Sequence, residues 1–220
     1  MALTLYGIAA SRAVRPLWAA KELGLAFEHV HTAYLGGGAR TPEMLALNPN
    51  GHIPVLVDAR PEGDVVVWES MACALYLARV HGKADGQSIA PATPAEEGEA
   101  LRWAFWAVTE LEKDALTVLM HLLAMPPEQR KPELAAAAEK RLAGPLAVLE
   151  QHLAAQRAKG QAHLAADRFT VADVCVASVV GWCKPAKPLM AQFPAVSAWL
   201  DACMARPAQQ ALRAMARSGQ

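Results

Sequence analysis

The sequence predicts two domains: an α/β N-terminal domain with a mixed four-stranded sheet, then an all-helical domain. Strand and helix patterns alternate over residues 1–81 in the order βαβ-α-ββα, and no convincing strand pattern follows before Gly160. Residues 82–92 are poor in apolar side chains and rich in glycine and proline, which indicates a linker. We therefore place the first domain at 1–81, the linker at 82–92 and the helical domain at 93–220.

The composition is that of a globular protein. The 220 residues are 54% hydrophobic and 19% charged, so the chain can bury a core, and its many alanines favour helix. The formal net charge is zero and gives no indication of a polyanionic partner. No secretory signal opens the chain, and its apolar stretches are too short to span a bilayer. We expect a cytoplasmic protein with no nucleic-acid and no membrane partner.

Cap and turn residues divide the first domain into its elements. Ser11 and Thr41 are N-cap residues, Gly24 ends the first helix, and the turn at 59–64 makes the last two strands a hairpin. The expected strands are Leu3–Tyr6, Phe27–Thr32, Ile53–Asp58 and Val65–Trp68, and the expected helices are Ser11–Gly24, Thr41–Asn48 and Ser70–His81.

The second half reads as a helical bundle. A capping box at Thr93 opens a long helix that ends before Pro126, and a second long helix contains Gly144–Pro145, where we expect a kink. The expected helices are 93–125, 132–157, 170–183, 194–205 and 207–216.

Four segments resemble those of one protein family. The stretches NPNGHIPVL (Asn48–Leu56), WESMACALYL (Trp68–Leu77) and DRFTVADV (Asp167–Val174) are similar to three motifs of glutathione transferases, in the same order and spacing. The stretch AASRAVRPLWAAKELG (Ala9–Gly24) resembles the start of many bacterial members of serine type. The resemblance covers nearly the whole chain. It implies a thioredoxin-like first domain that binds glutathione as co-substrate, and a homodimer.

The resemblance assigns the cysteinyl part of glutathione to Ile53 and Pro54. In the family the proline follows a cis peptide bond, and the backbone N–H and C=O of the preceding residue pair with the peptide ligand like an added strand. For an isolated X-Pro pair, a trans proline at a strand start is the commoner case. With the other motifs present, we predict the cis form.

The resemblance also assigns residues to the charged ends of glutathione. Ser70 caps a helix whose free N–H groups form an anion site, and the resemblance places the γ-glutamyl carboxylate there, with Glu69 on the amino group. His52 stands where relatives contact the glycyl carboxylate. Arg40 is a second candidate there, although a solvent-facing role is the more ordinary one for it.

Ser11 is the predicted catalytic residue. A hydroxyl that donates to the glutathione sulfur, together with the positive end of a helix, favours the thiolate. The alternative is that Ser11 only caps its helix, which would leave backbone N–H groups or Arg12 to stabilise the thiolate. Tyr6 is the rival hydroxyl, but it reads better as the end of the first strand.

The second substrate is expected to be a small hydrophobic electrophile that binds against the helical domain. The candidate pocket residues are Trp103, Trp106, Glu110 and Trp182. Aromatic residues at such spacing pack in cores by default. The long helix that carries three of them is apolar over more than one face, which favours a homodimer.

Metal and nucleotide chemistry find little support. His29 and His31 share one strand face, but no further ligand stands at a telling spacing, so we predict no metal. Gly36–Gly38 does not form a dinucleotide-binding motif. None of the four cysteines forms a C-x-x-C pair, and none precedes Cys73, which argues against a cysteine-type reductase.

The predicted function is a glutathione S-transferase. An isomerase, a dehalogenase or a disulfide reductase would keep the same fold and the same glutathione site. A non-catalytic binding protein built on this fold is the alternative from another class, because a fold does not dictate a function.

Overall fold

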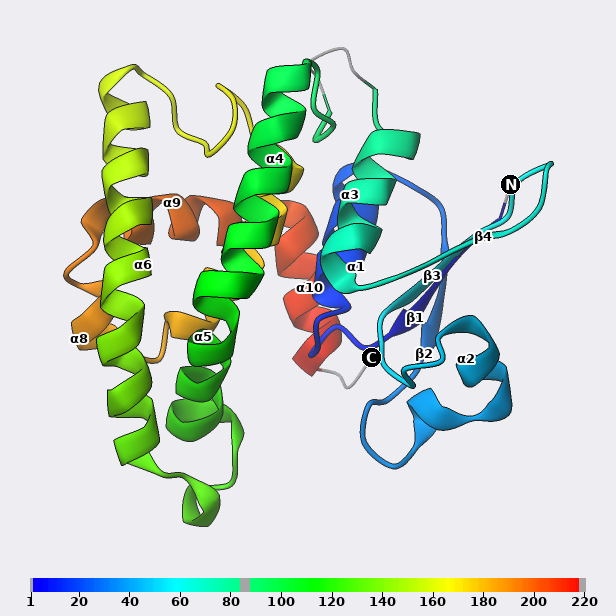
Figure 1. Cartoon of the computed structure of the whole chain (residues 1–220), viewed down its shortest axis with the longest axis horizontal. Coiled ribbons are helices and arrows are strands. Elements are labelled where there is room, and N and C mark those ends of the chain that lie inside the picture. Colours follow the sequence, from blue (N-terminus) through cyan, green and yellow to red (C-terminus); the bar gives the residue numbers. More distant parts are fainter. Residues whose placement is uncertain (1, 84–87, 218–220) are drawn as a thin grey trace. The chain divides into compact units, whose positions relative to one another are not determined.

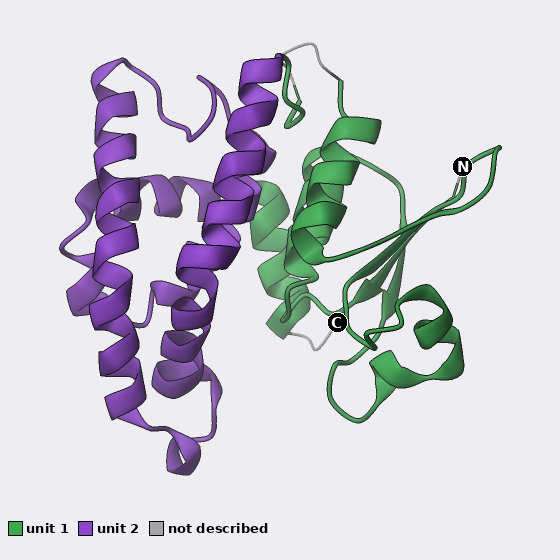
Figure 2. Cartoon of the chain, viewed as in Figure 1, with its two compact units in different colours: residues 1–92, 206–220 green, residues 93–205 purple. Residues whose placement is uncertain are grey.

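The computed structural model describes residues 2–83 and 88–217 of the chain. They form two compact units, one made of residues 1–92 and 206–220 and the other of residues 93–205 (Figure 2).

The first unit is built on a mixed four-stranded sheet, which confirms the predicted α/β class. Its strands are β1 (Leu3–Gly7), β2 (Glu28–His31), β3 (Val55–Asp58) and β4 (Val65–Trp68). They lie in the order β2-β1-β3-β4, with β1 parallel to β2 and antiparallel to β3 (Figure 1). Leu3 and Leu5 of β1 are buried while Thr4 and Tyr6 are half-buried, as expected for a strand whose two faces differ.

Three helices accompany this sheet: α1 (Val14–Glu22), α2 (Pro42–Leu47) and α3 (Ser70–His81). Helices α1 and α3 pack against each other, and α3 also contacts β3 and β4. Helix α2 begins as predicted, because the Thr41 hydroxyl accepts a hydrogen bond from the Met44 N–H and Pro42 needs no partner. Helix α1 begins at Val14 and not at Ser11, because residues 11–13 form a turn in which the Ser11 carbonyl accepts from the Val14 N–H.

The second unit is helical, also as predicted. Its α-helices are α4 (Pro94–Trp106), α5 (Glu112–Leu119), α6 (Pro132–Ala158), α7 (Val171–Val180), α8 (Lys187–Met190) and α9 (Pro194–Met204). The long helix expected before Pro126 contains two π-helical segments, η2 (Ala107–Leu111) and η3 (Met120–Ala124). Helix α6 is continuous through Pro145.

Buried Asp173 organises the start of α7. Its carboxylate accepts hydrogen bonds from the Thr170 N–H and the Leu164 N–H, and from the Trp199 indole of α9. The first of these completes the predicted capping box, in which the Thr170 side chain also accepts from the third helical N–H. The motif therefore serves the packing of α7 and α9.

The C-terminal helix differs from the predicted division of the chain. Helix α10 (Pro207–Arg217) belongs to the first unit, although residues 93–220 were predicted as one helical domain. It packs against α1, and Arg206 donates two hydrogen bonds of 2.7 Å to the Glu22 carboxylate. Glu22 also accepts from the indole of buried Trp18. Sequence periodicity identifies this helix but not the surface on which it packs.

Among the described residues, no helix is both long enough and apolar enough to cross a membrane.

One end of the sheet is held by a buried carboxylate. Asp58 is 0% exposed, and its Oδ2 accepts from Arg60 at 2.7 Å, Tyr76 at 2.8 Å and His81 at 2.9 Å. Burial by itself raises the pKa of Asp58, but these three hydrogen bonds outweigh burial and hold the pKa below its usual value. The cluster therefore ties β3 to the second half of α3.

We predict that Asp58 contributes stability that acid removes. Because its folded pKa is the lower one, this contribution is complete above about pH 4 and is lost as pH falls further. Asp58→Asn should lower the free energy of unfolding by about 2 kcal/mol or more at pH 7. Urea unfolding from pH 3 to pH 7 should show the two proteins converging at the acid end. Asp64→Asn, in the exposed turn after β3, is the control. An equal loss of unfolding free energy in Asp64→Asn would contradict the prediction, and so would a difference between wild type and Asp58→Asn that does not change with pH.

Candidate active site

The register of the sheet brings the predicted site segments to one end of the first unit. Tyr6 of β1 pairs with Val55 of β3, and Val55 pairs with Trp68 of β4. The loop after β1, the segment before β3 and the residues after β4 therefore leave the sheet at the same end. These three segments contain Ser11, Ile53 and Ser70 in turn.

Gly7 permits the close approach of two of these segments. Its φ is +147°, and a Cβ at this position would lie 2.6 Å from the Ala13 Cβ and 3.7 Å from the Ile53 Cβ. A side chain here would therefore collide with the loop that carries Ser11. The absence of that side chain lets β1 end between the loop and Ile53.

The Ile53–Pro54 peptide bond is cis, as predicted. Asn48, which is 2% exposed, donates from its side chain to the His52 carbonyl at 2.9 Å, and its oxygen accepts from the Asn50 N–H. Among the described residues, no hydrogen bond uses the backbone N–H or C=O of Ile53. The segment thus presents an unpaired peptide edge just before the start of β3.

Glu69 and Ser70 form a strained corner between β4 and α3. Glu69 has φ +69°, the one non-glycine residue with positive φ in the described part of the chain. Such a conformation costs about 1–3 kcal/mol and is typical of functional sites. Ser70 is 5% exposed, and its Oγ accepts a hydrogen bond of 2.7 Å from Arg15.

Arg15 is a residue of this site that the sequence did not predict. The side chain is 1% exposed and reaches Ser70 across 55 positions of sequence. The sequence contained a signal for a buried arginine, because Arg15 stands close to the apolar residues Leu17 and Trp18 of the same predicted helix. An arginine that is buried almost always has a specific partner.

Ser11 takes part in a local turn. Its hydroxyl donates to the Ile8 carbonyl at 2.8 Å and accepts from the Ala13 N–H at 3.1 Å. The serine is half-buried and precedes the first turn of α1. In this state its hydrogen is directed to a backbone carbonyl.

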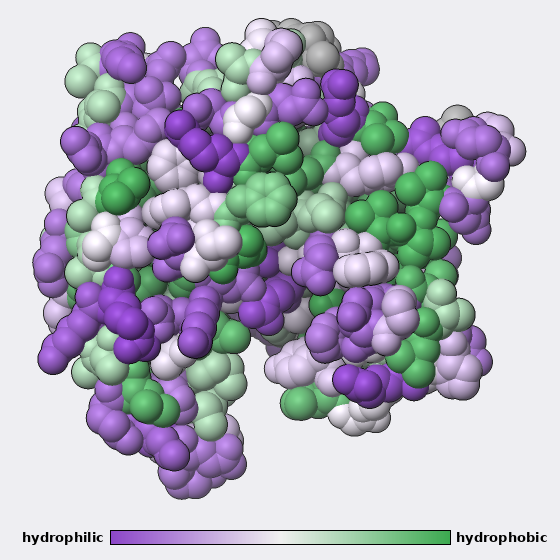
Figure 3. Space-filling model, in the orientation of Figure 1, coloured by the Kyte–Doolittle hydropathy of each residue, from purple (hydrophilic) through white to green (hydrophobic). Residues whose placement is uncertain are grey.

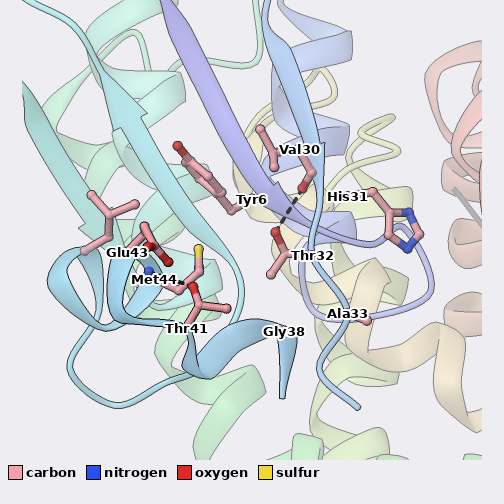
Figure 4. A pocket seen from close by; sticks show the side chains of 10 residues that line it. Tyr6, Val30, His31, Thr32, Ala33, Gly38, Thr41, Glu43 and Met44 are labelled. Carbon is pink, nitrogen blue, oxygen red and sulfur yellow. Dashed lines mark hydrogen bonds between the residues drawn. The ribbon is translucent and has the colours of Figure 1, made fainter. Parts of the chain in front are cut away.

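Tyr6 lies in different surroundings. It lines a cavity of about 320 Å³ together with Val30 of β2 and with Met44 and Leu47 of α2 (Figure 4). The tyrosine therefore belongs to the side of the sheet that α2 covers. This placement agrees with its interpretation as a strand residue.

His52 and Arg40 both lie next to Gly51. Both side chains are exposed, and a Cβ on Gly51 would lie 2.9 Å from the Arg40 Cγ. With φ +63°, Gly51 also has a backbone that other residues rarely adopt. Two basic side chains thus flank the segment that enters Ile53.

The predicted pocket residues of the second unit differ in exposure. Trp103 is 4% exposed, and its ring packs against Trp106 at 5.0 Å and His152 at 4.7 Å between centroids. Trp106 and Trp182 are half-buried, and Glu110 is exposed in the π-helical segment η2. Trp103 is therefore a core residue that supports Trp106.

Cysteine and metal chemistry have little basis in the described residues. Cys73, Cys175, Cys183 and Cys203 are all buried free thiols. Burial, reinforced by the Glu69 carboxylate, raises the pKa of Cys73 to about 12, and burial likewise raises that of Cys183 to about 12. Within the described ranges no cluster of three or more His, Cys, Asp or Glu side chains is suited to a metal ion, and His29 instead hydrogen-bonds the Gly7 carbonyl.

Ser70 is the first residue of α3 and not its predicted N-cap, because Glu69 occupies that position without a side-chain cap. The cis-proline loop, the Glu69–Ser70 corner and an N-terminal sheet followed by helices define the two-domain class that the motifs resemble. The glutathione S-transferase N-terminal domain family matches residues 1–79, and the corresponding C-terminal domain family matches residues 113–207. The chain belongs to the glutathione S-transferase family.

Relatives and solved structures agree with this placement. Glutathione S-transferase 3 of Zea mays is 36% identical over 218 residues, which cover 94% of this chain and 91% of that protein. Glutathione S-transferase GstB of Escherichia coli is 35% identical over 129 residues, which cover 58% of this chain and only 60% of that protein.

Two solved structures share the fold along nearly the whole chain. Glutathione S-transferase III in apo form has a TM-score of 0.79 at 34% identity and covers 97% of this chain and 96% of its own. The theta class enzyme of Xanthomonas axonopodis pv. citri, solved with glutathione bound, has a TM-score of 0.79 at 30% identity and covers 95% of each chain.

Proposed function

We propose that this family member binds glutathione at the end of the sheet in its first unit and transfers it to a small hydrophobic electrophile. The observation that carries the proposal is the pair of unsatisfied groups there. The Ile53 backbone offers a donor and an acceptor, and the Ser70 hydroxyl keeps its hydrogen. A peptide with a free carboxylate satisfies both.

The tripeptide would lie along these groups from one charged end to the other. Its cysteinyl residue pairs with Ile53, beside Pro54, as an added antiparallel strand. The γ-glutamyl carboxylate takes the Ser70 hydroxyl at the N-terminus of α3, and Glu69 receives the amino group. The glycyl carboxylate lies toward His52 and Arg40.

Ser11 would stabilise the glutathione thiolate. Its hydrogen leaves the neutral Ile8 carbonyl for the sulfur, and this exchange is favourable because a bond to a charged acceptor is the stronger one. The positive end of α1 acts in the same direction. The thiolate then forms a carbon–sulfur bond with the electrophile. In a substitution the leaving group departs with the electron pair of the broken bond, and in an addition the displaced π electron pair stays on the electrophile and takes up a proton.

The second unit would supply the contacts for the electrophile. Trp106, Glu110 and Trp182 keep exposed surface, while Trp103 holds Trp106 in place. Glu110 lies in a π-helical segment, a local irregularity that recurs at functional sites.

The rival functions differ in their chemistry. An isomerase or a dehalogenase would use the same thiolate on another electrophile, and a binding protein would lack the thiolate. A disulfide reductase that depends on a cysteine nucleophile is disfavoured, because all four thiols are buried.

We predict glutathione binding with a Kd between about 1 μM and 1 mM, as for other metabolite sites. Ser70→Ala should weaken it about tenfold, since one charge-assisted hydrogen bond is lost. Isothermal titration calorimetry measures both values. Ser178→Ala, whose hydroxyl bonds the Cys175 carbonyl in the helical unit, is the matched control. No heat of binding at 10 mM glutathione in the wild type would refute the proposed function.

We also predict that Ser11→Ala raises the pKa of bound glutathione and lowers kcat about ten- to a hundredfold. Binding affinity should change much less, because Ile53 and Ser70 hold the peptide. A pH–rate profile with an aryl halide, and the ultraviolet absorbance of the bound thiolate, measure these effects. Thermal melting corrects for the lost turn contact of about 1 kcal/mol. An unchanged pKa with normal kcat would show that Ser11 is only a cap.

A homodimer is the remaining part of the proposal. Figure 3 shows apolar residues exposed among polar ones on the face in view, and on α4 both Leu101 and Phe105 are exposed, at 43% and 64%. These two residues lie one helical turn apart and form an apolar stripe.

We predict a species of twice 23.5 kDa in sedimentation at tens of micromolar protein. The double variant Leu101→Lys with Phe105→Lys should shift it toward monomer, because a charge would be buried in the contact. Val148→Lys on α6, also an exposed apolar residue, is the control. A wild-type monomer would refute the dimer, and dissociation by Val148→Lys alone would place the contact elsewhere.

A further inference from the structure

Arg15 links the N-termini of two helices. It is the second residue of α1, while Ser70 is the first residue of α3. Its guanidinium donates to the Ser70 Oγ at 2.7 Å, and both side chains are buried, at 1% and 5% exposure. A hydrogen bond between buried side chains so far apart in sequence fixes the position of each.

The chemistry of this pair determines the direction of the hydrogen bond. A guanidinium carries only donors, so the Ser70 oxygen must be the acceptor. The hydroxyl has one hydrogen, which is then left to donate elsewhere. Among the described residues, no acceptor takes that hydrogen.

We propose that Arg15 is a positioning residue that holds Ser70 as a hydrogen-bond donor toward a carboxylate of the bound ligand. The proposal rests on the glutathione-binding function proposed above and names what selects its γ-glutamyl end. Without Arg15, the Ser70 hydroxyl is free to turn its hydrogen to another acceptor, as Ser11 does. The buried positive charge also polarises the O–H bond and strengthens it as a donor.

The contrast between the two serines supports the assignment. Both lie at the same end of the sheet and both precede or begin a helix. Ser11 directs its hydrogen to the Ile8 carbonyl and accepts from a backbone N–H. Ser70 accepts from a charged side chain and keeps its hydrogen. Only the second arrangement is preset for an anionic acceptor.

A double-mutant cycle tests whether Arg15 acts through Ser70. We expect Arg15→Lys to weaken glutathione binding about tenfold in wild-type background and less than twofold in Ser70→Ala background. Arg79→Lys, an exposed residue on α3, is the matched control and should keep the wild-type Kd. Equal losses in both backgrounds would overturn the proposal.

A second ligand separates positioning from a merely structural role. In the analogue, the α-carboxylate of the γ-glutamyl residue is converted to a primary amide. The wild type should prefer glutathione, so its Kd for the amide should exceed its Kd for glutathione. In Arg15→Lys the ratio of the amide Kd to the glutathione Kd should be about tenfold smaller. A general loosening of the site would weaken both ligands alike, and an unchanged ratio would overturn the proposal.

One further variant keeps the test decisive if Arg15→Lys does not fold. In Ser70→Asp, a carboxylate replaces the acceptor that faces Arg15 and cannot donate at neutral pH. Its thermal midpoint should equal or exceed that of Ser70→Ala, and it should not bind glutathione; a lower midpoint would overturn the proposal. A wild type that binds no glutathione overturns the proposed function as well, whereas binding with an unchanged ratio overturns only the role of Arg15.

Discussion

The pairing of β1, β3 and β4 is the constraint on which the candidate site depends. Tyr6, Val55 and Trp68 are neighbours across three strands, so the chain segments beyond them emerge together. Antiparallel pairing makes this possible, since β3 enters the sheet where β1 and β4 leave it. A shift of β3 by one residue relative to β1 and β4 would turn the side chains of β3 to the opposite face of the sheet and move Ile53 relative to the Ser70 corner.

The two ends of the sheet differ in their contacts. At one end, Arg60, Tyr76 and His81 converge on Oδ2 of buried Asp58 and tie β3 to α3, although the Asp58 Oδ1 has no hydrogen-bond partner among the described residues. At the other end, the Ile53 backbone and the Ser70 hydroxyl retain unused hydrogen-bonding capacity. Backbone groups that are left unpaired are costly when buried, so this end suits a ligand with complementary groups. Helix α3 connects the two ends, because Tyr76 and His81 contact Asp58 while Ser70 lies at the candidate site.

Local patterns in the sequence were sufficient for the fold class and for most of the elements, because strand and helix patterns alternate in the first domain. The cis Ile53–Pro54 bond was predicted from the resemblance to glutathione transferases, since the local pattern alone favours a trans proline. Three features were not predicted correctly. The start of α1 was misplaced because Ser11 caps a turn and not the helix itself. Arg15 was passed over because its partner is 55 positions away. Helix α10 was assigned by its position in the chain, whereas its apolar face and Arg206 attach it to α1.

Because α10 belongs to the first unit, that unit is made of two separate parts of the chain. The helical unit is inserted between residues 92 and 206 of the other, so the path of the polypeptide passes from one unit to the next twice. Truncation after residue 92 would strip a packing partner from α1 and leave the Glu22 carboxylate and its Trp18 neighbour uncovered. Chimaeras with other members of the family therefore need two junctions, with the terminal helix taken from the same parent as α1.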